Sequence, residues 1–306
     1  MEYKEFVNQV LEEVRSRMPL CGVELTKVKK NNGIILDGIS IKHGDSVISP
    51  VFYLNCRYTD EYQKGKSVSQ IAEGICSGYE KIRDSNEIDA QDISAFWEFD
   101  KAKERIVYRI INKEKNKDIL KEIPHMDFVG DITVVFAYLV EAKEQRGATI
   151  TVHNRIMELW GTDVKELYRL AGINTPRIMG WNLRSMSDVI AGFGGCGDGA
   201  VTVQDREDVD GGMSMYVLTN TCSLHGAACI LYPGLLKSIG EKLGDDYYII
   251  PSSLHETLIL PLAYSCSPDQ LADMIRTVNA TQVEDEDVLS DSPYFYSRDK
   301  GTLIAA

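Results

Sequence analysis

Apolar residues recur at helical spacing near the start of the chain and again between positions 68 and 82. The first set is Phe6, Val7, Val10, Leu11, Val14 and Met18. This spacing predicts an amphipathic helix, which Pro19 ends because proline cannot continue a helix. Ser67 and Gln70 form a capping-box pattern ahead of the second set and predict the start of another helix there.

Three runs with strand character lie between these helices: VELTKVK, IILDGISIK and VISPVFYLN. Asn32-Gly33 separates the first two and tolerates the positive φ values of a tight turn, so this pair is predicted to be a hairpin. Pro50 lacks an amide donor and indicates an edge strand or a bulge in the third run. The pattern predicts an α-β-β-β-α unit.

The middle of the chain alternates between strand and helix patterns. IVYRIIN (106–112) is predicted to be a strand, with a helix as the alternative, and DITVVFAYLVE (131–141) a strand that pairs with ATITV. Two helices are predicted near residues 153–160 and 163–171, and Gly172 is predicted to end the second with a positive φ.

A glycine-rich and acidic stretch at 191–214 interrupts this pattern and is predicted to be the most mobile internal segment. It suggests an N-terminal part (1–185), a flexible loop (186–214) and a C-terminal part (215–306). The last part is predicted to run β-β-α-β-β-α, with AACILY as a strand, Ser267-Pro268 starting the final helix and a loosely packed acidic tail beyond Asn279. The predicted fold class is α+β, with mixed or antiparallel sheets flanked by helices.

The composition disfavours two classes of partner. The net charge of −13, from 46 acidic and 33 basic residues, repels polyanions and disfavours nucleic acid. No apolar run approaches the about 18 residues that cross a bilayer. The charged, amphipathic N-terminal stretch MEYKEFVNQVLEEV does not resemble a signal peptide, so a cytoplasmic location is predicted, with the seven cysteines as reduced thiols.

Three motifs that could hold a cofactor or a metal are each interpreted otherwise. GFGGCG (192–197) lacks the preceding strand of a dinucleotide site, and REDVDGG (206–212) lacks two acidic ligands of a calcium loop. Cys222-x2-His225-x3-Cys229 has spacings that a metal could use, but Cys229 lies in the apolar run AACIL and is interpreted as a packed thiol in a hairpin. The sequence therefore predicts no cofactor and no metal.

The candidate chemistry concentrates in YYIIPSSLHETLILP (247–261). If residues 253–259 are extended, Ser253 and His255 share one face and Glu256 lies with leucines on the other. This alternation argues for a structural corner in which Glu256 is buried and paired, either with a backbone amide at a turn or with a cation of the preceding helix, of which Lys237 and Lys242 are nearest in sequence. The lone histidines His125 and His153 could act as acids or bases, although a capping or bridging role is commoner.

Several stretches resemble a bacterial protein family. They are IIN (110–112) with Asn116 and Pro124-His125, ELYRLAGINTP (166–176), MYVLTN (215–220) and GAACILYPGLLKSIGEKLGDDYYIIPSSLHETLILP (226–261). They are similar to proteins from anaerobic Gram-positive gut bacteria that are catalogued only as a domain of unknown function. DITVVFAYLVE through ELYRLAGINTP is also similar, more weakly, to a second such bacterial family. Neither resemblance implies an activity.

Two classes of function remain open. The first is a non-catalytic binding or regulatory module, which holds a protein or a small molecule at a sheet edge or an inter-domain groove. The second is a small-molecule hydrolase, with Ser253, His255, Glu256 and His125 as the candidate catalytic residues. The absence of a recognisable nucleophile or metal motif favours the first class. Convergence of His125, His153 and His255 in space would favour the second.

Overall fold

The computed structural model describes residues 1–44, 49–85, 90–143, 146–193 and 215–306. The chain forms two compact units, Met1–Asp92 and Ile93–Ala306. This division lies far from the boundary predicted between 1–185 and 215–306. Of the predicted loop 186–214, the first residues form a helix (Met186–Phe193), and residues 194–214 lie outside the described residues. The prediction that this segment is mobile therefore stays a prediction.

The first unit has the predicted α-β-β-β-α order. Its elements are α1 (Tyr3–Arg17), β1 (Cys21–Lys29), η1 (Asn31–Gly33), β2 (Ile35–His43), β3 (Val51–Tyr53), η2 (Arg57–Tyr62) and α2 (Val68–Ser85). The strands form an antiparallel sheet in the order β1-β2-β3. Positive φ angles at Asn32 and Gly33 make the β1–β2 turn, and Pro50 directly precedes the edge strand β3. Both predictions are confirmed.

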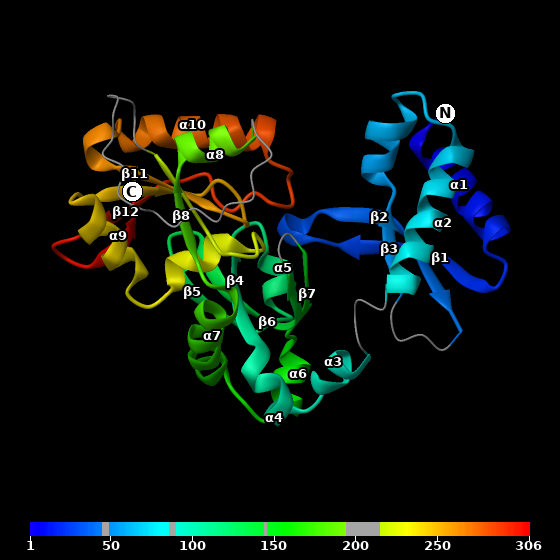
Figure 1. Cartoon of the computed structure of the whole chain (residues 1–306), viewed down its shortest axis with the longest axis horizontal. Helices are drawn as coiled ribbons and strands as arrows, with labels where there is room; N and C mark the ends of the chain where they lie inside the picture. Colours follow the sequence, from blue (N-terminus) through cyan, green and yellow to red (C-terminus); the bar gives the residue numbers. More distant parts are fainter. Residues whose placement is uncertain (45–48, 86–89, 144–145, 194–214) are drawn as a thin grey trace. The chain divides into compact units, whose positions relative to one another are not determined.

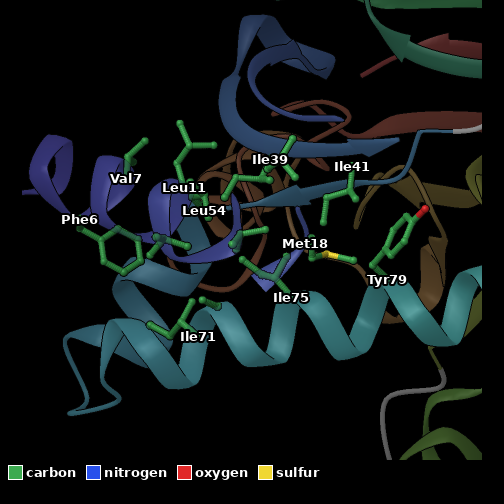
Figure 2. Packing of buried hydrophobic residues seen from close by; sticks show 14 residues of the cluster. Phe6, Val7, Leu11, Met18, Ile39, Ile41, Leu54, Ile71, Ile75 and Tyr79 are labelled. Carbon is green, nitrogen blue, oxygen red and sulfur yellow. The ribbon is translucent and has the colours of Figure 1, made fainter. Parts of the chain in front are cut away.

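The core of this unit lies between the two helices and one face of the sheet (Figure 2). Phe6 and Val10 of α1 and Ile71 of α2 are fully buried, as are Ile39 and Ile41, which alternate onto the same face of β2. Burying one such side chain contributes about 1.5–3 kcal/mol. The capping box is also confirmed, because Ser67 N–H donates to Gln70 Oε1 (3.0 Å) and Gln70 N–H donates to Ser67 Oγ (3.3 Å).

The second unit contains two antiparallel sheets. The four-stranded sheet consists of β4 (Ile106–Asn112), β5 (His125–Val129), β6 (Ile132–Lys143) and β7 (Arg146–Thr151). In this sheet β6 pairs with the other three strands. β4 lies along one edge of β6, and β5 and β7 lie one after the other along the opposite edge. The six-stranded sheet has the order β13-β12-β10-β11-β9-β8. Its strands are β8 (Asn182–Ser185), β9 (Tyr216–Thr219), β10 (Tyr247–Ile250), β11 (Thr257–Pro261), β12 (Tyr294–Ser297) and β13 (Thr302–Ala305).

Helices flank these sheets, as the predicted fold class requires. The helices of this region are α3 (Ala90–Ala95), α4 (Phe99–Ala102), η3 (Lys103–Arg105), α5 (Lys117–Leu120), α6 (Asn154–Leu159), α7 (Val164–Met179), α8 (Met186–Phe193), η4 (Gly226–Leu231), α9 (Leu235–Leu243), η5 (Leu262–Tyr264) and α10 (Pro268–Gln282). Figure 1 shows α8 and α10 along one side of the six-stranded sheet and α9 along the other. Within the described residues, no helix combines the length and the apolar character needed to cross a bilayer.

Helix α7 covers the outer edge of β4. Tyr108 N–H donates to Thr175 Oγ1 (3.2 Å), and Asn174 Nδ2 donates to the carbonyl of Ile106 (3.0 Å). The helix passes through Gly172 and ends at Gly180, whose φ is 55°. The predicted end at Gly172 is wrong, because the residues that satisfy the strand edge lie beyond it and tertiary contacts outweigh the low helix propensity of glycine.

Residues 226–231 correct the predicted β-β-α-β-β-α order. They form the 3-10 helix η4 and not a strand. All six residues are buried, so the apolar run carried no alternation that could distinguish the two structures. The amide of Ala227 donates to the carbonyl of Leu254 (3.2 Å), and that of Ala228 to the carbonyl of His225 (3.2 Å). These hydrogen bonds to residues of the neighbouring loops take the place of the inter-strand hydrogen bonds that a strand would need.

The predicted loosely packed tail is also wrong. Ser267 and Pro268 start α10 as predicted, with Gln270 completing a capping box. Beyond α10, however, Leu289 and Tyr294 are fully buried, and β12 and β13 complete the six-stranded sheet.

Polar contacts hold this C-terminal segment against the four-stranded sheet. The carboxylate of Asp131, in the β5–β6 turn, accepts hydrogen bonds from Asn112 Nδ2 (2.6 Å), Ser290 Oγ (2.8 Å) and the Tyr294 hydroxyl. Asn279 Nδ2 donates to the carbonyl of Ser290 (3.0 Å). Each of these donors comes from a buried residue, so the network is sheltered from water.

Candidate functional site

Two loops of the second unit meet beside the six-stranded sheet. One connects β9 to η4 (220–225), and the other connects β10 to β11 (251–256). Because β9 and β11 are paired, with Leu218 opposite Thr257, the residues that follow β9 lie next to those that precede β11. Thr219 Oγ1 donates to the carbonyl of His255 (2.8 Å) and joins the two loops. These loops and Asp287 are called the two-loop site below.

A close backbone approach at Gly226 fixes the distance between the loops. A Cβ atom at this position would lie 2.1 Å from Thr219 Oγ1, 2.4 Å from the His255 carbonyl oxygen and 2.7 Å from the Asn220 nitrogen. Two of these three neighbours are backbone atoms and cannot rotate away. The site therefore requires glycine for its lack of a side chain.

Asn220 organises the β9–η4 loop from within. Its buried side chain donates to the carbonyl of Leu224 (2.7 Å) and accepts from the amides of Cys222 (3.0 Å) and Leu224 (3.2 Å). The loop that it holds places Ser223 and His225 in the left-handed region, each with a φ of 52°. This conformation costs about 1–2 kcal/mol for a residue with a side chain. The loop therefore stores strain, which native structures concentrate at functional sites.

His255 supports the strained loop from the other side. Its Nδ1 accepts a hydrogen bond from the backbone amide of His225 (3.3 Å), and its Nε2 lies 3.4 Å from Asp287 Oδ1. The two imidazole rings stack with centroids 5.5 Å apart and planes 18° apart. The amide of Leu254 donates to the Asp287 carbonyl (2.9 Å), which brings the aspartate beside the ring. In the neutral form this arrangement selects the Nε2–H tautomer of His255.

The two histidines have opposite electrostatic environments. The hydrogen bond to Asp287 raises the pKa of His255, although partial burial opposes the rise. Burial lowers the pKa of His225 well below its ordinary value, and the positive charges of Arg109 and His255 lower it further. At neutral pH the His225 ring is therefore uncharged and can both donate and accept a hydrogen bond.

Arg109 brings a desolvated positive charge to this region. It lies in β4 opposite Val135 of β6, and Ala137 of β6 lies opposite Thr151 of β7. Its Nη2 donates to Thr151 Oγ1 (2.9 Å), and its Nε is buried with no hydrogen-bond partner. Burial lowers the pKa of Arg109 to about 10. Among the described residues no carboxylate forms an ion pair with it.

Ser253 and His255 lie in a loop, because β11 begins only at Thr257. The alternation expected of an extended strand therefore does not apply to residues 253–256. Ser253 Oγ accepts a hydrogen bond from the backbone amide of His255 (3.0 Å) and not from its ring. Glu256 is only half-buried. The predicted partner Lys237 forms an ion pair with Glu241, with Lys237 Nζ 3.8 Å from Glu241 Oε1. The prediction that Glu256 is buried and paired is wrong.

The other predicted residues lie apart from His255. His125 is exposed at the start of β5, with its Nδ1 3.1 Å from the Ile123 carbonyl oxygen, and His153 is exposed at the N-cap of α6. Across the described part of the chain, no hydrogen bond, ion pair or ring contact joins either of them to His255. The histidine that meets His255 is His225, which the sequence suggested only as a possible metal ligand.

The metal and cofactor motifs give a mixed outcome. Cys229 is fully buried, as predicted for a packed thiol, but it lies in η4 and not in a hairpin. In the ranges that the structure describes, no three His, Cys, Asp or Glu side chains gather closely enough to hold a metal ion. Residues 194–197 of GFGGCG and all of REDVDGG lie outside the described residues.

Comparison with known proteins adds one finding. The model of a family described as a family of unknown function (DUF5688) matches residues 3–298. No curated protein and no solved structure matches the sequence. The matched span includes Arg109, both loops and Asp287, so the residues of the site belong to the part of the chain that the family shares.

Proposed function

This chain belongs to DUF5688, a family of unknown function, and on that premise we propose that it is a non-catalytic ligand-binding module whose binding surface is the two-loop site. The ligand is a small molecule or a segment of a protein. The predicted location in the cytoplasm of a bacterium, within the Gram-positive group suggested by the resemblance, is part of this proposal.

The observation that carries the proposal is the strained β9–η4 loop. Its left-handed Ser223 and His225 are held by the buried Asn220 and by the ring of His255. A loop needed only to connect β9 to η4 could avoid this cost with glycine at either position. Strain that the surrounding structure maintains is characteristic of sites that present a side chain in a fixed position. Here the presented side chain is the uncharged imidazole of His225.

The alternative, a hydrolase built on Ser253 and His255, receives less support from the geometry. A serine nucleophile needs a ring nitrogen of the histidine within hydrogen-bond reach of its hydroxyl. One ring nitrogen of His255 accepts the His225 amide and the other faces Asp287, while Ser253 Oγ is bonded to the backbone. The histidine and the aspartate thus support a loop and leave no ring nitrogen for the serine.

Histidine-selective ¹H–¹⁵N NMR of the full chain tests the proposal. A library of metabolites and short peptides should contain ligands that shift the imidazole signals of His225 and His255 and leave those of His125 and His153 unchanged. Ser253→Ala should bind such a ligand as the parent protein does. Turnover of ester, amide or phosphoester substrates by the parent, lost in Ser253→Ala and His255→Gln, would overturn the proposal in favour of the hydrolase.

A further inference from the structure

Arg109, which lowers the pKa of His225 in the two-loop site, has no acidic partner among the residues that the structure describes. Guanidinium groups have five N–H donors, and proteins rarely bury them without a carboxylate. Arg109 makes one hydrogen bond, to Thr151, and its Nε is buried and unpartnered. The chain carries 46 acidic residues, so the missing partner does not reflect a shortage of carboxylates.

Within the part of the chain that the structure describes, Arg109 forms no ion pair with a carboxylate, and the groups identified near it can donate hydrogen bonds. Thr151 supplies a hydroxyl, and His225 an uncharged imidazole. His125 lies opposite Val135 on β5, so it shares the sheet face of Arg109 at a Cα distance of about 10 Å, two strand spacings. The charge of His255 is balanced by Asp287. Arg109 therefore carries a positive charge that no ion pair among the described residues compensates.

We infer that the ligand of the two-loop site carries a carboxylate, which Arg109 binds with its free guanidinium N–H groups beside His225. The inference rests on the proposed function and names the chemistry of its ligand. A monoanion neutralises the single charge of Arg109, whereas a phosphate dianion would leave a surplus negative charge in a desolvated place. The planar guanidinium also matches the planar carboxylate, with which it forms paired hydrogen bonds.

The test compares anions on matched arginine variants of the full chain. Acetate, benzoate, inorganic phosphate and chloride are titrated at constant ionic strength and pH 7.5, with the melting temperature and the His225 imidazole signal as readouts. All three tryptophans (Trp97, Trp160 and Trp181) lie in the second unit, so their fluorescence reports on its unfolding. Arg109→Met removes the charge at similar volume. Arg184→Met is the control, because Arg184 in β8 also has a buried, unpartnered Nε but does not act on the pKa of His225.

We expect the carboxylates to raise the melting temperature and to shift the His225 signal in the parent and in Arg184→Met. In Arg109→Met their affinity should fall at least tenfold. The ligand-free Arg109→Met protein should melt at or above the parent temperature, because the substitution removes an unpaired buried charge. If Arg109→Met does not fold, Arg109→Lys replaces it, and the loss of the paired geometry should still weaken carboxylate binding severalfold.

The opposite results separate two failures. A response to phosphate and not to the carboxylates, or carboxylate binding that Arg109→Met leaves intact, overturns this inference. Other ligands would then still shift the His225 and His255 signals, and the proposed function would stand. If the parent protein instead turns over substrates through Ser253 and His255, the proposed function itself fails.

Discussion

Gly226→Ala tests the close approach that sets the geometry of the two-loop site. The added methyl group would lie 2.1 Å from Thr219 Oγ1, 2.4 Å from the His255 carbonyl oxygen and 2.7 Å from the Asn220 nitrogen. The hydroxyl of Thr219 can rotate away only by giving up its hydrogen bond to the His255 carbonyl. The His255 carbonyl can move away only if the two loops separate, and the Asn220 nitrogen can move away only if the β9–η4 loop itself changes shape.

The magnitude follows from these contacts. Overpacking by one methyl group costs about 1–3 kcal/mol, and losing the Thr219 hydrogen bond adds about 0.5–1.5 kcal/mol. We therefore expect a loss of about 3 kcal/mol in the free energy of unfolding. For a unit of 150–250 residues, about 2–4 °C per kcal/mol converts this loss to a fall of about 6–12 °C in melting temperature.

Tryptophan fluorescence during thermal unfolding of the full chain is the assay. Gly172→Ala is a matched control, because it makes the same substitution inside α7, where a Cβ meets no atom within 4 Å. Replacing a glycine inside a helix should stabilise the unit by about 0.5–1 kcal/mol. The two substitutions should thus change the melting temperature in opposite directions. Equal melting temperatures for Gly226→Ala and the parent would show that the two loops do not approach as described.

Three further predictions concern strain, buried polarity and pH. Ser223→Gly should stabilise the protein by about 1 kcal/mol in thermal melts, because the exposed serine adopts a left-handed conformation that glycine adopts freely; a loss of stability would count against the strain. Tyr294→Phe should cost about 2 kcal/mol and lower the melting temperature by about 4–8 °C, because it removes a buried donor to Asp131; an unchanged melt would contradict the network. The stability from His255 is complete below its unfolded pKa of about 6.5 and is lost as the pH rises through its raised folded pKa. His225 acts in the opposite sense, since its lowered pKa reduces stability as the pH falls below about 6.5. In thermal melts from pH 5 to 8, His255→Gln should remove the loss of stability that the parent protein shows above pH 6.5. A variant with the same pH profile as the parent would refute this role of His255.

Local patterns were sufficient for much of the fold. Short stretches of sequence were enough to predict the helices of the first unit, its hairpin and the strands β4 and β6. The signals were periodicity, capping residues and turn residues. The prediction that AACILY is a strand was wrong because a segment buried on all sides has no polar-apolar alternation to distinguish a strand from a 3-10 helix. The prediction that the helix ends at Gly172 was wrong for a related reason, because contacts between α7 and β4 decide where α7 ends.

The site could be predicted only in part, because its parts are distant in sequence. His255 was a candidate, but its partners His225 and Asp287 lie 30 residues before it and 32 after it. Asp287 was assigned to an acidic tail, since a few apolar residues among carboxylates give no sign of burial. Arg109 lies inside a strand pattern, where nothing local reveals that a charged side chain lacks an acidic partner. Only the pairing of β9 with β11 and the packing of the C-terminal segment bring these groups together.

The cover that α7 places over β4 has a consequence for association between molecules. An uncovered strand edge is a template on which another chain can add a strand, and it is a common route to aggregates. At residues 106–108 the amide of Tyr108 and the carbonyl of Ile106 already have side-chain partners on α7, so an incoming strand finds no free groups there. Asn174 and Thr175 thus occupy the backbone groups with which an added strand would have to pair. Their replacement by apolar residues of similar size would leave the Tyr108 amide and the Ile106 carbonyl without these side-chain partners.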